Sequence, residues 1–235
     1  MNTAAEEAPE ESEATRRKYW REGLLAGVGL GIGAFALAVS FGVAAVAQGW
    51  PAWLVVLMSA TVFAGGAQFA IVLAFSGGGG VIGAISAATL INLRFVPLAI
   101  SAARGLRGGL WQRSLEAQAV LDASWATARR PDGSVSREKM IAATLMQWPA
   151  WVGGTAIGAY LSPSSALVKQ WGLDTLFPAM FLIFVLDIWR VSPRQRPVIL
   201  LAAGIAGVMC WFVPPGVALL CSGVAGFLAL RRREG

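Results

Sequence analysis

No charged residue interrupts residues 23–93, which read GLLAGVGLGIGAFALAVSFGVAAVAQGWPAWLVVLMSATVFAGGAQFAIVLAFSGGGGVIGAISAATLINL. An α-helix rises about 1.5 Å per residue, so about 20 apolar residues cross the hydrocarbon layer of a bilayer. The stretch is therefore long enough for two or three crossings. It ends at Arg94, which is followed by the apolar run FVPLAI, so a permanent charge lies inside a hydrophobic segment. A charge in that position is costly and is usually kept for function.

The composition of the whole chain agrees with a membrane protein. The chain has 235 residues, of which 56% are hydrophobic and 14% are charged. Unbroken apolar runs predict helices, because the strands of a membrane barrel alternate polar and apolar positions. We therefore expect an all-α, polytopic helical bundle in the cytoplasmic (inner) membrane. The net charge of +6 comes from residues beside apolar segments, which predicts contacts with anionic lipid headgroups and not with nucleic acid.

Hydrophobic cores divide the chain and predict about seven transmembrane segments. They lie at about 24–47, 52–75, 81–103, 140–161, 174–189, 197–212 and 215–230. Residues 1–22 are predicted to be a disordered acidic tail that ends in a basic, aromatic membrane anchor. Residues 23–230 form the predicted transport domain, with a hydrophilic cytoplasmic segment at 104–139. Residues 231–235 are a basic C-terminal tail.

The distribution of basic residues conflicts with three simple early crossings. The positive-inside rule assigns residues 16–21, 104–139, 190–196 and 231–233 to the cytoplasm. Three full crossings between Arg21 and Arg104 would instead put Arg104 outside. We expect a broken or re-entrant helix near residues 63–68 or at the four-glycine turn 77–80, or else a further crossing at 114–128. The similar sequences AQGW at 47–50 and KQWG at 169–172 are compatible with an inverted repeat, an arrangement found in transporters with discontinuous helices.

Five residues are candidates for a substrate site: Gly65, Gly66, Gln68, Asn92 and Arg94. The planar guanidinium of Arg94 suits a carboxylate, which it can bind with two parallel hydrogen bonds. Its alternative role is to extend toward the membrane surface. Gln68 either binds substrate or forms a hydrogen bond across a helix interface, and the glycines also suit close helix packing.

A second set of residues is predicted to take part in coupling or gating: Asp122, Asp174, Trp148 and Pro149. Asp122 lies in a predicted amphipathic helix within 114–128. For Asp174, the position favours a cap on the N-terminus of the following helix over a role in the site. Pro149 lies inside a predicted crossing, where it removes a helix hydrogen bond and should cause a kink.

Several common kinds of active site are excluded. The chain has no histidine and two cysteines, Cys210 and Cys221, both in apolar runs. Zinc and haem sites built on those ligands and Ser-His-Asp catalytic sets are therefore ruled out. We expect no enzymatic activity, no metal and no cofactor.

Taken together, several short motifs resemble the AzlC family, the large subunit of branched-chain amino acid exporters. They are SFG at 40–42, MS at 58–59, FAGGAQF at 63–69, NLR at 92–94, GG at 153–154 with Gly158, GLD at 172–174 and FPAMF at 177–181. Two departures stand out. The family usually has histidine after Asn-Leu-Arg, where this chain has Phe95, and a second acidic residue after Asp122, where this chain has Ala123.

The resemblance implies a secondary transporter that exports leucine, isoleucine and valine, with methionine as a further candidate. It also implies a small hydrophobic AzlD-type membrane subunit as a partner. Loss of the family histidine leaves open a transporter of another small neutral or anionic solute. An intramembrane enzyme or a non-transporting membrane scaffold remains a further alternative. An enzyme would need a nucleophile paired with a base, which the sequence does not show. The buried Arg94 argues against a scaffold.

Overall fold

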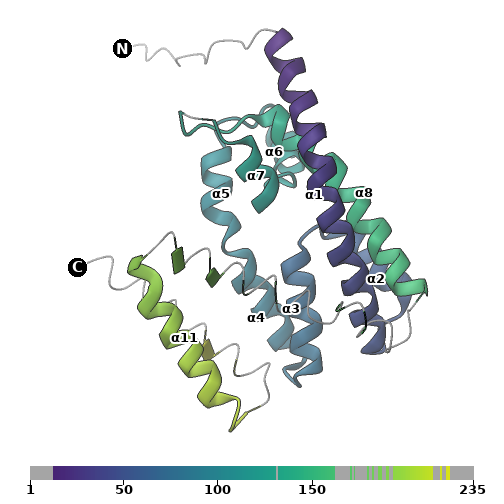
Figure 1. Cartoon of the computed structure of the whole chain (residues 1–235), viewed down its shortest axis with the longest axis vertical. Coiled ribbons are helices and arrows are strands. Elements are labelled where there is room, and N and C mark those ends of the chain that lie inside the picture. Colours follow the sequence, from purple (N-terminus) through teal and green to yellow (C-terminus); the bar gives the residue numbers. More distant parts are fainter. Residues whose placement is uncertain are drawn as a thin grey trace. The chain divides into compact units, whose positions relative to one another are not determined.

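The computed structural model describes residues 13–130, 132–161 and 193–213, together with isolated positions between 170 and 190 and between 218 and 222. In this part of the chain the regular structure is helical, so the predicted all-α class is confirmed there (Figure 1). The elements are α1 (Glu13–Ala47), α2 (Ala52–Thr61), α3 (Gly65–Ser76), α4 (Gly80–Asn92), α5 (Phe95–Ala102), α6 (Leu110–Ala117), α7 (Asp122–Ala128), α8 (Arg137–Leu161), η1 (Pro193–Gln195) and α11 (Arg196–Met209).

The chain divides into two compact units. One consists of Met1–Leu30 and Pro97–Gln147, and the other of Gly31–Val96 and Trp148–Gly235. We call the first the ionic unit and the second the apolar unit. Helices α1 and α8 contribute to both units.

One helix in the described residues, α1, is long and apolar enough to cross a membrane by itself. Helices α4 and α5 pass the same test only when they are taken together as one bent span. Most of the cores predicted at 174–189 and 215–230 lie outside the described residues. The total of about seven transmembrane segments therefore stays a prediction.

The second predicted core contains a break. Helix α2 ends at Thr61 and α3 begins at Gly65, beside the FAGGAQF motif where a discontinuity is predicted. The Val62 N–H still donates to the Met58 carbonyl, but the Ala64 N–H donates to Val62, only two residues back. The carbonyl of Ala60 instead accepts a hydrogen bond from Nε1 of Trp148 in α8, at 3.2 Å. A tryptophan from another helix thus satisfies a carbonyl that the break releases.

The third predicted core, 81–103, is also interrupted, at a position other than the two where a break is expected. Helix α4 ends at Asn92 and α5 begins at Phe95, so Arg94 lies in the short connection between them. Pro97 explains the break, because it has no N–H to donate to the carbonyl of Leu93 four residues earlier. Pro149, by contrast, lies within α8, which continues as one helix from Arg137 to Leu161.

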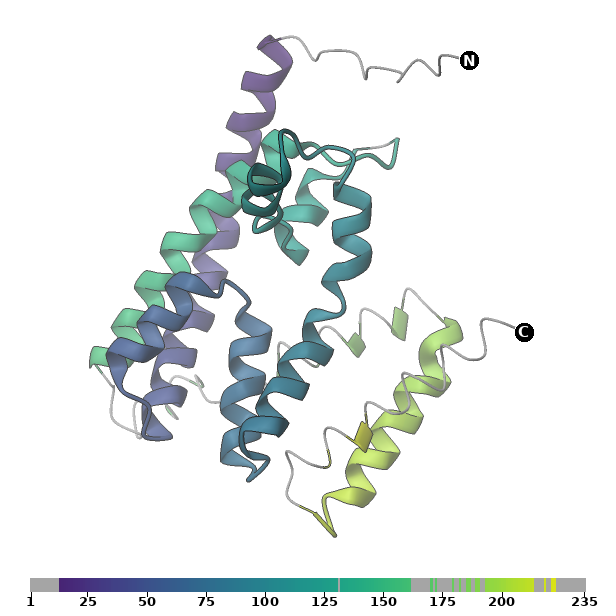
Figure 2. The same ribbon diagram turned by 180° about the vertical axis from the view of Figure 1, so that it is seen from behind.

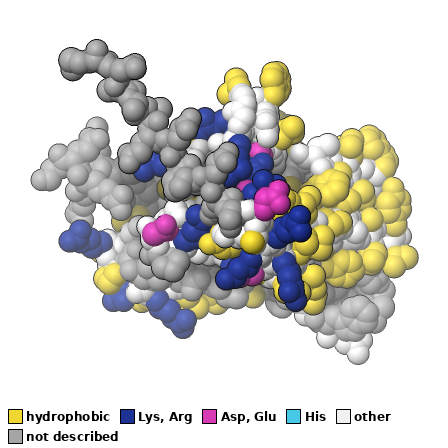
Figure 3. Space-filling model, turned by 90° about the horizontal axis from the view of Figure 1, so that it is seen from above, with side chains coloured by type: hydrophobic (Ala, Val, Ile, Leu, Met, Phe, Trp, Pro, Cys, Tyr) yellow, Lys and Arg dark blue, Asp and Glu magenta, His cyan; other side chains and the backbone are white. Residues whose placement is uncertain are grey.

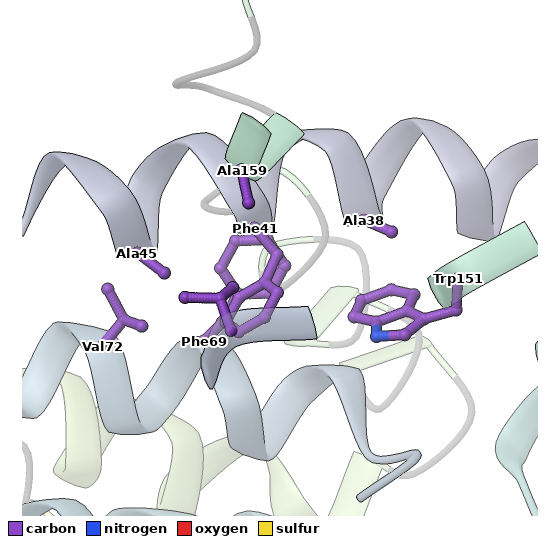
Figure 4. Close-up of a cluster of buried hydrophobic side chains, with 8 residues drawn as sticks. Ala38, Phe41, Ala45, Phe69, Val72, Trp151 and Ala159 are labelled. Atoms are coloured by element: carbon purple, nitrogen blue, oxygen red, sulfur yellow. The ribbon is translucent and has the colours of Figure 1, made fainter. Parts of the chain in front are cut away.

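The core of the apolar unit joins α1, α2, α3 and α8 (Figure 4). The rings of Phe41 in α1 and Phe69 in α3 form a T-shaped pair with centroids 5.4 Å apart, and Phe41 stacks on Trp151 of α8 at 6.3 Å. A second cluster of small residues lies between α3 and α4, which run side by side in both ribbon views (Figures 1 and 2). The four-glycine turn at 77–80 connects these two helices.

Glycines bring α1 and α8 into close contact. In the apolar unit, a Cβ atom on Gly42 would overlap the Thr155 carbonyl, and one on Gly158 would overlap the Val39 carbonyl. In the ionic unit, a Cβ atom on Gly27 would lie 2.8 Å from the Ala143 carbonyl oxygen. Small residues at helix contacts allow backbones to approach in this way.

The ionic unit corrects the prediction for residues 114–128. The structure has two short helices, α6 and α7, in place of one amphipathic helix or a further crossing. Neither is long enough to span a bilayer. The chain turns between them because Ala119 and Val120 are buried against Ala128 and Met140. The chain turns after Arg130, where Gly133 has φ 84° and its N–H donates to the Arg130 carbonyl.

Candidate functional site

Arg94 and Gly66 lie together at the start of α3. A Cβ atom on Gly66 would lie 3.2 Å from Nη2 of Arg94 and 3.4 Å from Cγ2 of Ile91. The guanidinium carbon of Arg94 also stands 5.0 Å from the centroid of the Phe95 ring. The side chain is half-buried within the apolar unit. Two of the predicted site residues, separated in sequence by most of α3 and α4, are thus neighbours.

The N-terminus of α3 adds partial positive charge beside Arg94. The first N–H groups of a helix have no acceptor within that helix, and the helix dipole favours an anion there. The preceding residue, Ala64, makes no side-chain cap. Gly66 places no side chain between the start of α3 and the Arg94 guanidinium. The local chemistry therefore suits a carboxylate.

Gln68 is fully buried in a network of neutral hydrogen bonds. Its Oε1 accepts from Nε1 of Trp151 at 2.9 Å, and its Nε2 donates to Oγ of Ser59 at 3.3 Å. Ser59 and Thr155 lie 2.9 Å apart through their hydroxyl oxygens. The Trp151 ring also covers Gly65, where a Cβ atom would overlap it. The network joins α2, α3 and α8 and fixes the position of the α3 N-terminus.

Asn92 lines a hollow of about 510 Å³ in the apolar unit. Its walls are almost entirely apolar, with Ile71, Phe75, Ala84, Ala88 and Leu93 among the lining residues. The Oδ1 atom of Asn92 is buried and accepts no hydrogen bond from the described residues. An acceptor at an apolar wall is suited to an N–H group of a ligand, since leaving such an atom unpaired is costly. Arg94 follows the lining residue Leu93 but does not itself line this hollow.

The residues predicted for coupling or gating do not form one cluster. Asp122 begins α7 in the ionic unit, whereas Trp148 and Pro149 lie in α8 at the start of the apolar unit's second segment. Trp148 caps the end of α2, as described above. Asp174 lies outside the described residues. In the described part of the chain, no group of three His, Cys, Asp or Glu side chains could hold a metal ion.

The ionic unit holds a buried ion-pair cluster that the sequence did not predict. Arg137 donates to both carboxylate oxygens of Glu116, with Nε 2.8 Å from Oε2 and Nη2 on Oε1. Its Nη1 lies 3.5 Å from Oε1 of Glu138, whose side chain is buried. Hydrogen bonding from Arg137 lowers the pKa of Glu116 to about 2, against the opposing effect of burial, and the Arg107 N–H adds to it. The same contact raises the pKa of Arg137.

Sequence signals pointed to some of these residues but not to their partners. Ser59 lies in a motif shared with the AzlC family, and Trp151 and Thr155 are four apart on α8, so they share a helix face. Nothing in the spacing of Glu116 and Arg137 indicated that they would pair.

Comparisons with known proteins agree with the motifs. Residues 29–164 match the family model described as AzlC protein. The chain is 27% identical over 237 residues to the inner membrane protein YgaZ of Escherichia coli, covering 94% of each chain. It is 21% identical over 168 residues to an uncharacterized membrane protein of Helicobacter pylori, covering 70% of this chain and 73% of the relative. No solved structure gives a significant match.

Proposed function

Because the chain belongs to the AzlC family, we propose that it is a secondary transporter that exports branched-chain amino acids across the cytoplasmic membrane. The proposed substrates are leucine, isoleucine and valine, with methionine as a further candidate. The observation that carries the proposal is the half-buried Arg94 guanidinium beside Gly66 at the start of α3. A multi-pass arrangement and alternating access are parts of the same proposal.

The carboxylate of the substrate is assigned to Arg94 and the α3 N-terminus. Half-helix N-termini that point at anionic substrate groups are a recurring arrangement in transporters with broken helices. The break at 62–64 supports this assignment because it creates such an N-terminus within an apolar segment. Gln68 already bonds Trp151 and Ser59, so we assign it to positioning this N-terminus.

The ammonium and side chain of the substrate are assigned to the hollow lined by Asn92 and Leu93, which directly precede Arg94. Because one carbon carries both the carboxylate and the ammonium, this assignment places the substrate where the hollow meets Arg94. The buried Oδ1 of Asn92 supplies an acceptor for the ammonium. The apolar walls suit a branched aliphatic side chain, and a volume of about 510 Å³ lies within the range of small-molecule sites, about 300–1,000 Å³. Both groups of residues belong to the apolar unit.

Substitution of Arg94 tests the proposal. Arg94→Ala should lower the export of labelled isoleucine from loaded vesicles about 10-fold or more, because a hydrogen bond to a charged group contributes about 1.5–3 kcal/mol. Arg94→Lys should retain part of the activity, since the charge remains but the planar fork is lost. Arg21→Ala, the same change at an exposed residue, is the matched control. Wild-type export by Arg94→Ala at equal protein level in the membrane would contradict the assignment.

A second candidate is a transporter of another small neutral or anionic solute. Phe95 supports it, because the family usually has histidine there and Arg94 stacks on the Phe95 ring. A panel of labelled amino acids and organic anions in the same vesicles distinguishes the two functions. Competition of Arg94-dependent flux by an organic anion, but not by isoleucine, would favour the second.

An AzlD-type membrane subunit is proposed as the partner. The family resemblance supports this proposal, and an adjacent reading frame encoding about 100 residues with several apolar runs would be the expected source. Co-expression of such a chain should allow co-purification in detergent and raise export. Full export activity of the single chain in proteoliposomes would count against an obligatory partner.

A further inference from the structure

A second hollow, in the ionic unit, is lined by arginines. Its volume is about 1210 Å³, and its lining includes five arginines: Arg16, Arg104, Arg107, Arg130 and Arg137. Three acidic residues also line it: Glu13, Asp132 and Glu138. Figure 3 shows dark-blue basic side chains gathered around magenta carboxylates on one face of the molecule. The lining thus has an excess of positive charge that the proposed transport of amino acids does not use.

Some of these arginines already have structural roles. Arg137 pairs with Glu116 and Glu138, and Nη2 of Arg107 lies 3.9 Å from Glu138. Arg130 stands 4.8 Å from the ring centroid of Tyr19 in α1. The carboxylate of Asp132 accepts hydrogen bonds from the N–H and hydroxyl of Ser134 within its own turn. These contacts hold the wall of the hollow in place.

Arg16 and Arg104 are different, because both are exposed at the hollow and neither forms an ion pair with the described residues. They come from α1 and from the connection after α5, so two separate segments present guanidinium groups to one space. Guanidinium groups bind phosphate oxygens with paired hydrogen bonds. A phosphate-bearing anion is therefore the ligand that this lining fits.

Helix α6 of the same unit indicates where such an anion would come from. Its Leu110, Trp111 and Leu115 are 81%, 87% and 74% exposed, while Glu116 is buried on the opposite face. An amphipathic helix with exposed leucine and tryptophan lies in the membrane interface, at the depth of the headgroups. Basic pockets at that depth bind the headgroups of anionic lipids.

We propose that this hollow binds a phosphate-bearing anion through Arg16 and Arg104, and that an anionic phospholipid of the surrounding membrane supplies it. The inference does not depend on the transported substrate. The lipid would hold α1 and the segment after α5 together at the membrane surface, with α6 lying beside it in the interface.

Lipid binding to the full chain tests the proposal. The purified protein in detergent is titrated with phosphatidylglycerol, with phosphatidylcholine and, in a separate arm, with inorganic phosphate, and bound adducts are measured by native mass spectrometry. The double variant Arg16→Gln with Arg104→Gln should weaken phosphatidylglycerol binding about 10-fold or more, since each basic residue near an anionic lipid adds to the free energy of binding. The control is Arg17→Gln with Arg129→Gln, which also removes two exposed charges but lies outside the lining.

The arms separate the sources of the anion. Binding of phosphatidylglycerol that depends on Arg16 and Arg104, with weak phosphatidylcholine binding, supports the lipid. Dependence on the same residues for inorganic phosphate but not for phosphatidylglycerol keeps the anion site and overturns the lipid as its source. An equal loss in both double variants, or no loss in either, overturns the site.

Discussion

The apolar and ionic units solve the same problem, the burial of polar groups, with different chemistry. In the apolar unit the buried polar side chains Gln68, Ser59 and Thr155 are neutral, and Trp151 joins them through its indole N–H. The ionic unit also buries neutral groups, such as Gln147, which donates to Ser124, but it alone of the two buries carboxylates among the described residues: Glu116 and Glu138, paired with Arg137. Uncharged groups avoid the large cost of desolvating an ion, whereas paired ions need partners with good geometry.

This difference between the units makes Arg94 a candidate functional residue. Arg94 lies in the apolar unit beside the N-terminus of α3, where the buried hydrogen-bond network of Gln68, Ser59 and Trp151 is neutral. In the ionic unit, arginines have carboxylates to pair with and help to build the fold. A charge placed where the surrounding chemistry avoids charge is a stronger functional signal than a charge within an ion-pair cluster.

The largest expected effect tests the close contact of α1 and α8 in the apolar unit. Gly158→Leu should destabilise the protein by about 3 kcal/mol or more, because even a Cβ atom would overlap the Val39 carbonyl and overpacking is costly. Thermal unfolding in detergent, followed by size-exclusion chromatography, measures it. Gly153→Leu in the same helix is the control, since a Cβ atom there meets nothing within 4 Å. Equal unfolding temperatures for the two variants would show that the contact is not tight.

The next effect tests the ionic unit. Glu116→Gln should cost about 1.5–3 kcal/mol, because it removes the charged acceptor of a bidentate pair and leaves Arg137 partly buried. Glu13→Gln is the control, since the Glu13–Arg17 pair is 85% exposed at both side chains and such pairs contribute little, within about 0.5 kcal/mol. Denaturant titration of both variants measures the difference. A loss for Glu13→Gln as large as that for Glu116→Gln would remove the distinction between buried and surface pairs.

A smaller effect is expected in the neutral network. Gln68→Leu should cost about 1–2 kcal/mol, because it leaves the Trp151 N–H without its acceptor while Ser59 still bonds Thr155. The exposed Gln48→Leu is the control. Unlike the loss for Glu116→Gln, this loss should not change with salt, because no ion pair is involved. A loss that fell as salt was raised would place a charge in the network.

The last prediction concerns how stability depends on pH through the titration of Glu116, an effect that is smallest near neutral pH. Its pKa is lowered from 4.5 to about 2 in the folded protein, so the ion pair contributes its full stability above about pH 4.5. That contribution should be lost as pH falls toward 2, when the carboxylate takes up a proton. Unfolding temperatures from pH 7 to 3 should therefore fall less steeply for Glu116→Gln than for the wild type. Parallel curves would contradict the lowered pKa.

The sequence predicted the break of the second core but not that of the third. Conflict between the positive-inside rule and three full crossings, together with the glycines at 65 and 66, pointed to the first break. Pro97 was a local signal for the break in the third core, but the apolar residues around it made the segment look like one continuous span. The candidate site residues were chosen because charges and amides are rare in apolar segments. The sequence did not predict the contacts of these residues, because the partners are far apart in the chain: Gln68 and Trp151 are separated by 83 positions.

The amino-acid sequence alone determined that this chain is helical and built for a membrane, because long runs without charge can satisfy their backbone in lipid only as helices. It also determined the family and the presence of a cation among apolar residues. Only the tertiary structure decided that Arg94 lies in a break beside Gly66, that Gln68 is engaged by Trp151 and Ser59, and that Glu116 pairs with Arg137. Those facts depend on which helix faces meet, and hydrophobic patterning specifies that a face is apolar without specifying its partner.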